Sequence, residues 1–69
     1  MINTAELNQA MEHSGMKKSA VAGRLRLTTQ TLTRKLNGES EFNISEAQEL
    51  SEILNLSPGQ RQRIFFGGK

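Results

Sequence analysis

The chain has 69 residues, no cysteine and a formal net charge of +2. A chain of this length forms at most one small domain, and the missing cysteines exclude disulfides and thiolate metal sites, which fits a reducing compartment. No apolar run approaches the roughly 18 residues of a membrane-spanning helix, and the N-terminus lacks the charged and apolar regions of a signal peptide. We therefore expect a cytoplasmic protein that has no membrane partner.

The inventory of chemically reactive side chains is small. The chain has one histidine, His13, and no aspartate, tyrosine or tryptophan, and it has no glycine-rich phosphate loop. Metal sites and general acid–base catalysis need clusters of such groups. We expect no enzyme, no metal, no cofactor and no small-molecule ligand, with His13 exposed near the end of a helix.

Basic and acidic side chains are segregated along the chain. Residues 16–38 carry only basic charges, namely Lys17, Lys18, Arg24, Arg26, Arg34 and Lys35. Residues 39–52 carry only acidic charges, namely Glu39, Glu41, Glu46, Glu49 and Glu52. If these segments stay apart, the fold has a basic side that suits a polyanion. An ordinary solvated surface is the alternative interpretation.

The first predicted helix begins after Asn3 and ends at Gly15. Asn3 is the expected N-cap, and Glu6 stands three residues later, where it completes a capping-box pattern. Leu7 and Met11 have the spacing of one helix face, and Gly15 is a typical helix stop.

The second predicted helix runs from residue 17 or 18 to residue 25 or 26. The third has Thr28 as its N-cap and stops at Asn37-Gly38, because both residues tolerate the left-handed conformation. The inward positions of these two helices are apolar or small: Val21, Ala22, Leu25, Leu32 and Leu36.

Two further helices are predicted after a loop in which Phe42 turns inward. Ser45 is the expected N-cap of the fourth, with Gln48 completing a capping box. Ser57-Pro58 opens the fifth, in which Ile64 and Phe65 close the core. The expected fold class is all-α: a compact bundle of five short helices over residues 1–66, followed by a flexible tail at 67–69.

The segment from Lys18 to Asn37, KSAVAGRLRLTTQTLTRKLN, carries a resemblance. Its small Ala22 stands where two short helices cross, and TTQTL opens the second of them. The segment resembles the helix-turn-helix of the phage Cro and repressor family, also called Xre-type. The following LNGESEFNISEAQELSEILNLS is similar to the family's next loop and helix, so the resemblance spans nearly the whole chain and implies a lambda-repressor-like fold.

The sequence departs from the family pattern at two positions. Arg26 stands where the family usually has glycine; a side chain there strains the turn by about 1 kcal/mol, or the turn is built differently. Lys35 stands where the family tends to have an apolar residue. Leu36 can take over the burial, while Lys35 runs its stem along the core and places its ammonium near a phosphate.

Base reading is assigned to the third helix, because a recognition helix enters the major groove with its N-terminal residues nearest the bases. The outward residues expected to read bases are Thr29, Gln30, Thr33 and Arg34. Gln30 can pair bidentately with adenine and Arg34 with guanine, while the threonine methyls can touch a thymine methyl.

Phosphate contacts fix position rather than sequence. The expected backbone contacts are Lys17, Lys18, Thr28, Thr31, Lys35 and Asn37, together with amides near Asn37. Lys17 and Lys18 stand at the start of the second helix, and the resemblance matches Lys18 to a position that often holds a phosphate. Thr28 is a helix cap first and a DNA contact second, and Thr31 can instead bond within its own helix. Arg24 is a weaker candidate, because it can equally be solvated or paired with a glutamate.

The resemblance implies a Cro-like phage or prophage repressor that binds a pseudo-palindromic double-stranded DNA operator as a homodimer, with a monomer possible when free. If the chain is complete, it has no room for an effector domain. Phe66, next to Phe65, is either part of a dimer contact or simply exposed. The main alternative is a protein-interaction module on the same scaffold, of the antirepressor or antitoxin type. A membrane-surface helix at 61–66 is a further one.

Overall fold

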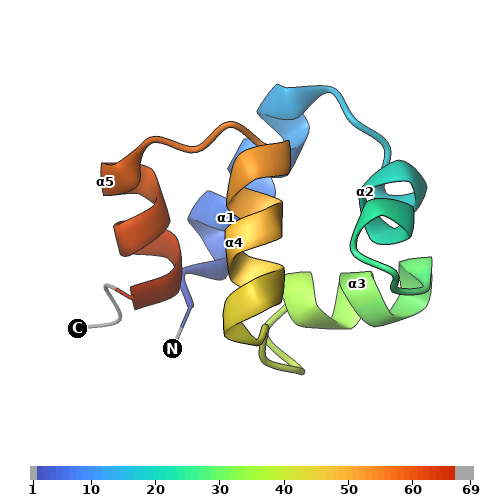
Figure 1. Cartoon of the computed structure of the whole chain (residues 1–69). Coiled ribbons are helices and arrows are strands. Elements are labelled where there is room, and N and C mark those ends of the chain that lie inside the picture. The colour runs from blue at the N-terminus through green and yellow to red at the C-terminus, as the bar shows by residue number, and fades with distance from the viewer. Residues whose placement is uncertain (1, 67–69) are drawn as a thin grey trace.

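The computed structural model describes residues 2–66, and within this range the chain forms helices without strands. The elements are α1 (Thr4–Ser14), α2 (Lys18–Arg24), α3 (Thr29–Leu36), α4 (Ile44–Ile53), α5 (Pro58–Arg61) and a π-helical continuation, η1 (Gln62–Phe66). Figure 1 shows α1 and α4 in the middle, with α2 and α3 to one side and α5 to the other. This arrangement confirms the predicted all-α bundle; the predicted tail at 67–69 lies outside the described residues.

The first helix begins and ends where the sequence predicts. The Asn3 side chain accepts a hydrogen bond from the Glu6 amide at 3.1 Å, and Gly15 adopts a left-handed φ of 71°. The predicted capping box is nevertheless wrong. The Glu6 carboxylate accepts hydrogen bonds from Arg63 of η1, the shortest at 2.6 Å, while the Asn3 amide donates to Ile64 O at 2.7 Å. These contacts tie α1 to η1.

The fourth helix starts two residues earlier than predicted. Its N-cap is Asn43, whose side chain accepts from the Glu46 amide at 2.7 Å, and the Glu46 carboxylate accepts from the Asn43 amide at 3.0 Å. Ser45, the expected cap, lies exposed inside the helix, so that prediction is wrong. Because the helix begins directly after Asn43, Ile44 occupies its first position.

A tight turn joins α4 to α5. Asn55 has a left-handed φ of 55°, and the amides of Asn55 and Leu56 donate to carbonyls in the last turn of α4 at 3.1 and 2.9 Å. This is the Schellman ending of a helix. The next residue, Ser57, caps α5 as the sequence predicts, with its hydroxyl oxygen accepting from the Gln60 amide at 3.1 Å. The Gln60 side-chain oxygen in turn accepts from the Ser57 amide at 3.0 Å.

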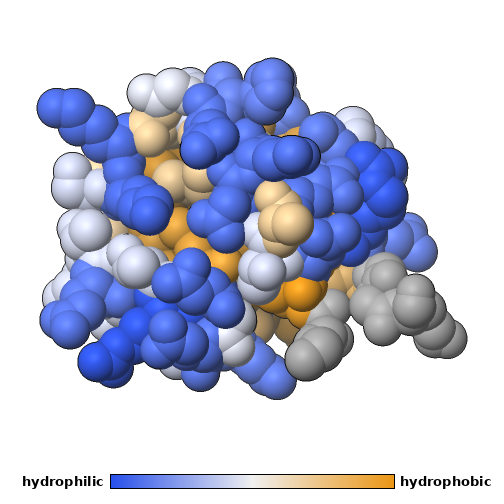
Figure 2. Space-filling model, turned by 180° about the vertical axis from the view of Figure 1, so that it is seen from behind, coloured by the Kyte–Doolittle hydropathy of each residue, from blue (hydrophilic) through white to orange (hydrophobic). Residues whose placement is uncertain are grey.

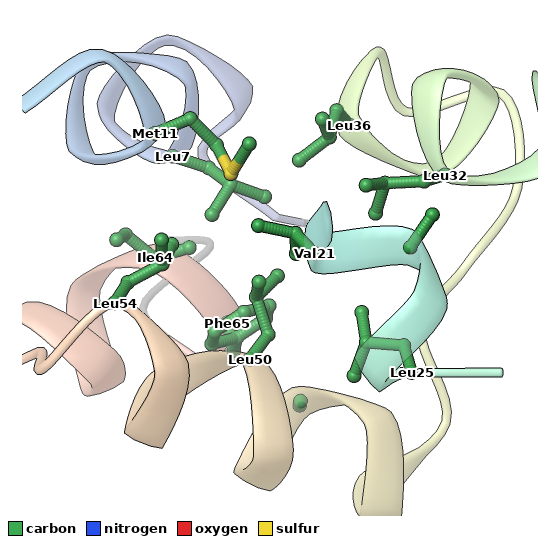
Figure 3. Packing of buried hydrophobic residues seen from close by; sticks show 12 residues of the cluster. Leu7, Met11, Val21, Leu25, Leu32, Leu36, Leu50, Leu54, Ile64 and Phe65 are labelled. Carbon is green, nitrogen blue, oxygen red and sulfur yellow. The ribbon is translucent and has the colours of Figure 1, made fainter. Parts of the chain in front are cut away.

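The core draws apolar side chains from α1, α2, α3, α4 and η1, which meet around Val21 (Figure 3). The fully buried side chains are Leu7, Val21, Leu32, Leu36, Leu50 and Ile64. Burying each of them stabilises the fold by about 1.5–3 kcal/mol. Most of the predicted inward positions are therefore confirmed, and Phe42 lies partly buried with its ring edge-on to Phe65 at a centroid distance of 5.7 Å.

The end of α3 is held against α1. The Asn8 side-chain amide donates to the Leu36 carbonyl at 3.2 Å and to the Thr4 carbonyl at 2.8 Å. Gly38 follows with a left-handed φ of 83°, and a Cβ there would lie 3.3 Å from the Thr4 methyl carbon. Only glycine combines this conformation with so close an approach.

One part of the surface is apolar. Figure 2 shows polar residues over most of one face, with apolar residues in the gaps between them. Among residues 2–66, the exposed large apolar side chains are Ile44, at 73% exposure, and Phe66, at 64%. Both line a hollow of about 350 Å³ between α4 and the α5–η1 segment, together with Ala47, Gln48, Pro58, Arg61 and Gln62. We call Ile44, Pro58 and Phe66 the apolar patch.

Candidate nucleic-acid interface

The turn between α2 and α3 contains Arg26, for which the sequence leaves two turn geometries open. Arg26 adopts a left-handed φ of 62°, its amide donates to Gly23 O at 3.1 Å, and the Leu27 amide donates to Ala22 O at 2.8 Å. Ala22 is buried, which lets the turn close over it. The turn therefore keeps a left-handed residue at position 26, with a side chain where glycine would be easier, at a cost of about 1 kcal/mol.

Thr28 caps α3 as predicted. Its hydroxyl oxygen accepts from the Thr31 amide at 3.1 Å, and its hydroxyl donates to the Thr31 hydroxyl oxygen at 2.9 Å. Both hydrogen bonds lie within one helical turn. The two hydroxyls thus share one hydrogen bond inside the protein, which leaves one hydroxyl proton of the pair for an outside acceptor.

The outer face of α3 carries the predicted base-reading residues. Thr29, Gln30 and Arg34 are exposed, and Thr33 is half-buried. Within the described part of the chain, neither the Gln30 nor the Arg34 side chain has a hydrogen bond or ion pair. The Thr33 hydroxyl donates back to the Thr29 carbonyl at 2.9 Å, which leaves its methyl and a lone pair for outside contacts. We call these four residues the reading face.

The basic side chains of α2 divide into two groups. Lys17 and Lys18, at the start of the helix, are exposed. Arg24, at the end, lines a hollow with Glu49, Glu52 and Ile53 of α4. Arg24 therefore faces an acidic helix, whereas the two lysines remain available to an outside anion.

The Lys35 side chain is paired within the protein. Its ammonium donates to a Glu46 carboxylate oxygen at 3.0 Å and to the Glu41 carbonyl at 2.8 Å, and only 14% of its side chain is exposed. The stem is buried as predicted. The charge, however, is neutralised within the fold, which removes the reason for placing it near a phosphate.

The backbone at the end of α3 is also occupied. The amides of Asn37, Gly38 and Glu39 donate to carbonyls of α3 at 3.0, 3.1 and 2.9 Å. These amides were expected to be available to a DNA strand. The exposed side chain of Asn37 is therefore what this segment offers to a phosphate.

Nothing in residues 2–66 gathers three histidine, cysteine or acidic side chains at a spacing that could hold a metal ion. No helix of that range is long and apolar enough to cross a membrane. The single histidine, His13, is exposed in the last turn of α1. What the described surface presents is an exposed polar helix face with two lysines nearby.

Comparison with known proteins agrees with this geometry. The family described as the Cro/C1-type HTH DNA-binding domain matches residues 6–60, which run from α1 into α5 and include both helices of the α2–α3 unit. The chain belongs to the Cro/C1-type family. No curated protein and no solved structure matches the chain.

Membership of the Cro/C1-type family makes this chain a DNA-binding regulator of the helix-turn-helix class that binds double-stranded DNA. In such proteins the second helix of the unit enters the major groove. Here that helix is α3, whose inner side chains Leu32 and Leu36 are fully buried, which leaves the opposite side of the helix exposed.

The sequence does not predict the exposure of one residue, Ile44. Ile44 lies in the apolar patch, but an isoleucine directly before the predicted N-cap Ser45 gives no sign of exposure. The signal that could have found it is the Asn43-x-x-Glu46 pattern, a capping box that puts Ile44 at the outward start of α4.

Proposed function

We propose that this protein is a sequence-specific transcriptional repressor of the Cro type, from a phage or prophage, that binds a pseudo-palindromic operator. The observation that carries the proposal is the reading face. Gln30 and Arg34 are exposed and free of partners in the described structure, on the side of α3 opposite its buried leucines. Side chains without internal hydrogen bonds or ion pairs, as Gln30 and Arg34 are here, are free to bond to bases.

The proposed base contacts follow from side-chain chemistry. Gln30 can donate to N7 and accept from N6 of an adenine in the manner of a planar amide, and Arg34 can donate to O6 and N7 of a guanine. Each bidentate pair discriminates against the wrong base by about 1–3 kcal/mol. Thr29 and Thr33 add methyl contacts to thymine, and the back-bonded hydroxyl of Thr33 favours its methyl for this role.

The proposed backbone contacts are fewer than the sequence suggests. Lys17 and Lys18 lie on one DNA strand, and the side chains of Thr31 and Asn37 lie on the other. Thr28 acts mainly as the cap, because its hydroxyl is already bonded to Thr31. Lys35 is left out, because its charge is paired with Glu46.

The apolar patch supports pairing with a second copy on the operator. A two-fold contact needs one surface that carries both a hollow and the side chain to fill it. Phe66 borders such a hollow, with Ile44 and Pro58 beside it. In Figure 1 the start of α4 and the end of η1 lie along the same edge of the molecule as α3, so a pair formed here can present both α3 helices to one DNA duplex.

Selection from a random DNA pool tests this function. The selected sequences of the wild type are expected to show two-fold symmetry, with half-sites about one helical turn apart. Gln30→Ala and Arg34→Ala should each relax the preference at defined base positions. Lys18→Ala, as the control, should weaken all sequences about equally and flatten the salt dependence of binding by about one unit.

Unchanged selected sequences in both reading-face variants would refute the base contacts. Affinity for random duplex DNA that does not fall between low and moderate salt would instead favour the protein-interaction alternative, because a DNA binder releases counterions.

A further inference from the structure

Lys35 and Glu46 form an ion pair at a largely buried position, where charged side chains are uncommon. The two side chains are 14% and 15% exposed, and Nζ lies 3.0 Å from Oε1. Removing both charges from water costs free energy, and an apolar pair of similar size often gives equal or greater stability. Stability alone therefore does not require a lysine here, since an apolar pair could supply as much, and we consider a geometric role.

The pair fixes the first residue of α4 relative to α3. The carboxylate oxygen of Glu46 that accepts from Lys35 also accepts from the Asn43 amide at 3.0 Å. The Lys35 ammonium bonds in addition to the Glu41 carbonyl at 2.8 Å. One ammonium and one carboxylate thus hold both the loop and the cap, and the next residue, Ile44, belongs to the apolar patch.

A second set of contacts leads to the same surface. The Lys35 ammonium lies 5.7 Å from the centre of the Phe42 ring, and that ring meets Phe65 edge-on at 5.7 Å. The Phe65 and Phe66 rings lie 6.4 Å apart. Ile44 directly follows Asn43, whose amide shares a Glu46 carboxylate oxygen with the Lys35 ammonium. Phe66 directly follows Phe65, which Lys35 reaches through the Phe42 ring.

We propose that Lys35 is a positioning residue that fixes the distance and angle between the reading face and the apolar patch, and so sets the one spacing of half-sites that a pair of molecules accepts. The proposal rests on the proposed function, since it needs a pair bound to two half-sites. Arg34, the neighbour of Lys35 on α3, contacts the base, while Lys35 holds the helix that carries it.

The experiment measures binding to three kinds of duplex: the selected operator, operators with one base pair added or removed between the half-sites, and a single half-site. One added base pair moves the second half-site by about 3.4 Å and rotates it around the DNA axis. A rigid pair should lose about tenfold in affinity on such DNA, because protein or DNA must deform.

Lys35→Met keeps the apolar stem and removes the charge. We expect the variant to bind a single half-site nearly as well as the wild type, with the same salt slope, and to lose most of its preference among spacings. A phosphate ligand would behave differently, because its loss lowers the salt slope by about 0.9. Lys35→Arg, which can still donate to both acceptors, should retain the spacing preference and shows whether the charge alone is needed.

Glu46→Gln and Glu41→Gln form a matched pair of variants for which we expect opposite changes in affinity for the operator. Both remove one acidic charge close to α3, so electrostatics alone predicts tighter DNA binding for both. Glu41 touches Lys35 only through its backbone carbonyl, and its variant should follow that expectation. Glu46→Gln should instead weaken binding to the correctly spaced operator and flatten the spacing preference.

The outcomes separate the two proposals. A wild type without sequence-specific binding refutes the proposed function, and the positioning role falls with it. A wild type that binds its operator but is indifferent to spacing, or variants at Lys35 and Glu46 that keep the full preference, overturn the positioning role alone. If Lys35→Met loses its circular dichroism signal for helix, Glu46→Gln and Lys35→Arg decide the question.

Discussion

Residues 25–28 and residues 54–57 form the same turn twice. The sequences are Leu-Arg-Leu-Thr and Leu-Asn-Leu-Ser, and the second residue of each has a left-handed φ, 62° for Arg26 and 55° for Asn55. In both turns the third residue donates its amide to a carbonyl five residues back, and a hydroxyl caps the next helix. The chain therefore uses one local solution to join α2 to α3 and α4 to α5.

The helices that follow the two turns differ in what they bury and expose. After the first turn, α3 buries Leu32 and Leu36 and exposes the reading face. After the second, α5 buries nothing over its four residues, and the chain continues into η1, which buries Ile64 and Phe65. The turn sets the angle between helices, whereas the side chains after it decide whether the unit contacts DNA or closes the core.

The largest expected effect tests whether the two turns are anchored alike. Leu25 and Leu54 are the buried first residues of the turns. Leu25→Ala and Leu54→Ala should each lower the free energy of unfolding by about 3 kcal/mol, because each leaves a cavity in the core. Urea denaturation at low temperature measures both. A loss below about 1 kcal/mol in one variant would show that the two turns are anchored differently.

A smaller effect separates the two left-handed residues. Arg26→Gly should raise the free energy of unfolding by about 0.5–1 kcal/mol, because glycine removes the left-handed strain but loses more entropy on folding. Asn55→Gly should change it by only a few tenths, because asparagine tolerates this conformation. Arg26→Asn is the control that removes the charge while keeping a side chain. Equal gains at positions 26 and 55 would contradict the strain argument.

The smallest effect concerns two ion pairs, Lys35–Glu46 at α3 and Glu6–Arg63 at η1. Hydrogen bonds from Arg63 lower the pKa of Glu6. Burial raises the pKa of Glu46, but hydrogen bonds from the Asn43 amide and the Lys35 ammonium outweigh it, so that this pKa is also lowered. Each carboxylate therefore stabilises the fold above its ordinary pKa of 4.5, and that contribution is lost as the pH falls through the lower, folded value.

Unfolding free energies measured between pH 3 and pH 7 should accordingly be flat above about pH 5 and decline below the ordinary pKa. Glu46→Gln should reduce the decline more than Glu6→Gln, because the Glu6–Arg63 pair is more exposed and more strongly screened. The opposite order would mean that the pair at η1 holds the fold more firmly than the pair at α3.

Features that depend on a few neighbouring residues could be predicted from the sequence. The caps Asn3, Thr28 and Ser57 and the stops at Gly15 and Gly38 were all confirmed, because each involves hydrogen bonds within one helical turn. The exposure of Gln30 and Arg34 follows in the same way from the buried leucines on the other side of α3. Their contacts with bases stay a prediction.

The errors concern side chains whose partners lie far away in the sequence. Glu6 bonds to Arg63, 57 residues later, rather than to the nearby cap. Two overlapping capping patterns begin at Asn43 and Ser45; the first forms, and its Glu46 also binds Lys35, 11 residues earlier. The same contact pairs the charge of Lys35 within the fold, which is why the proposed phosphate contacts leave this residue out. The local sequence pattern cannot rank such alternatives, because tertiary contacts between residues far apart in the sequence decide which one forms.

The contact between Gly38 and Thr4 has a consequence for changing the target of this protein. Because Asn8 and the missing Cβ at position 38 fix where α3 ends, the helix cannot gain or lose a turn without disturbing α1. The exposed positions 29, 30 and 34 carry no comparable restraint from their side chains. A library that varies those positions and keeps the length constant should consist largely of folded members, so new operators can be sought without rebuilding the scaffold.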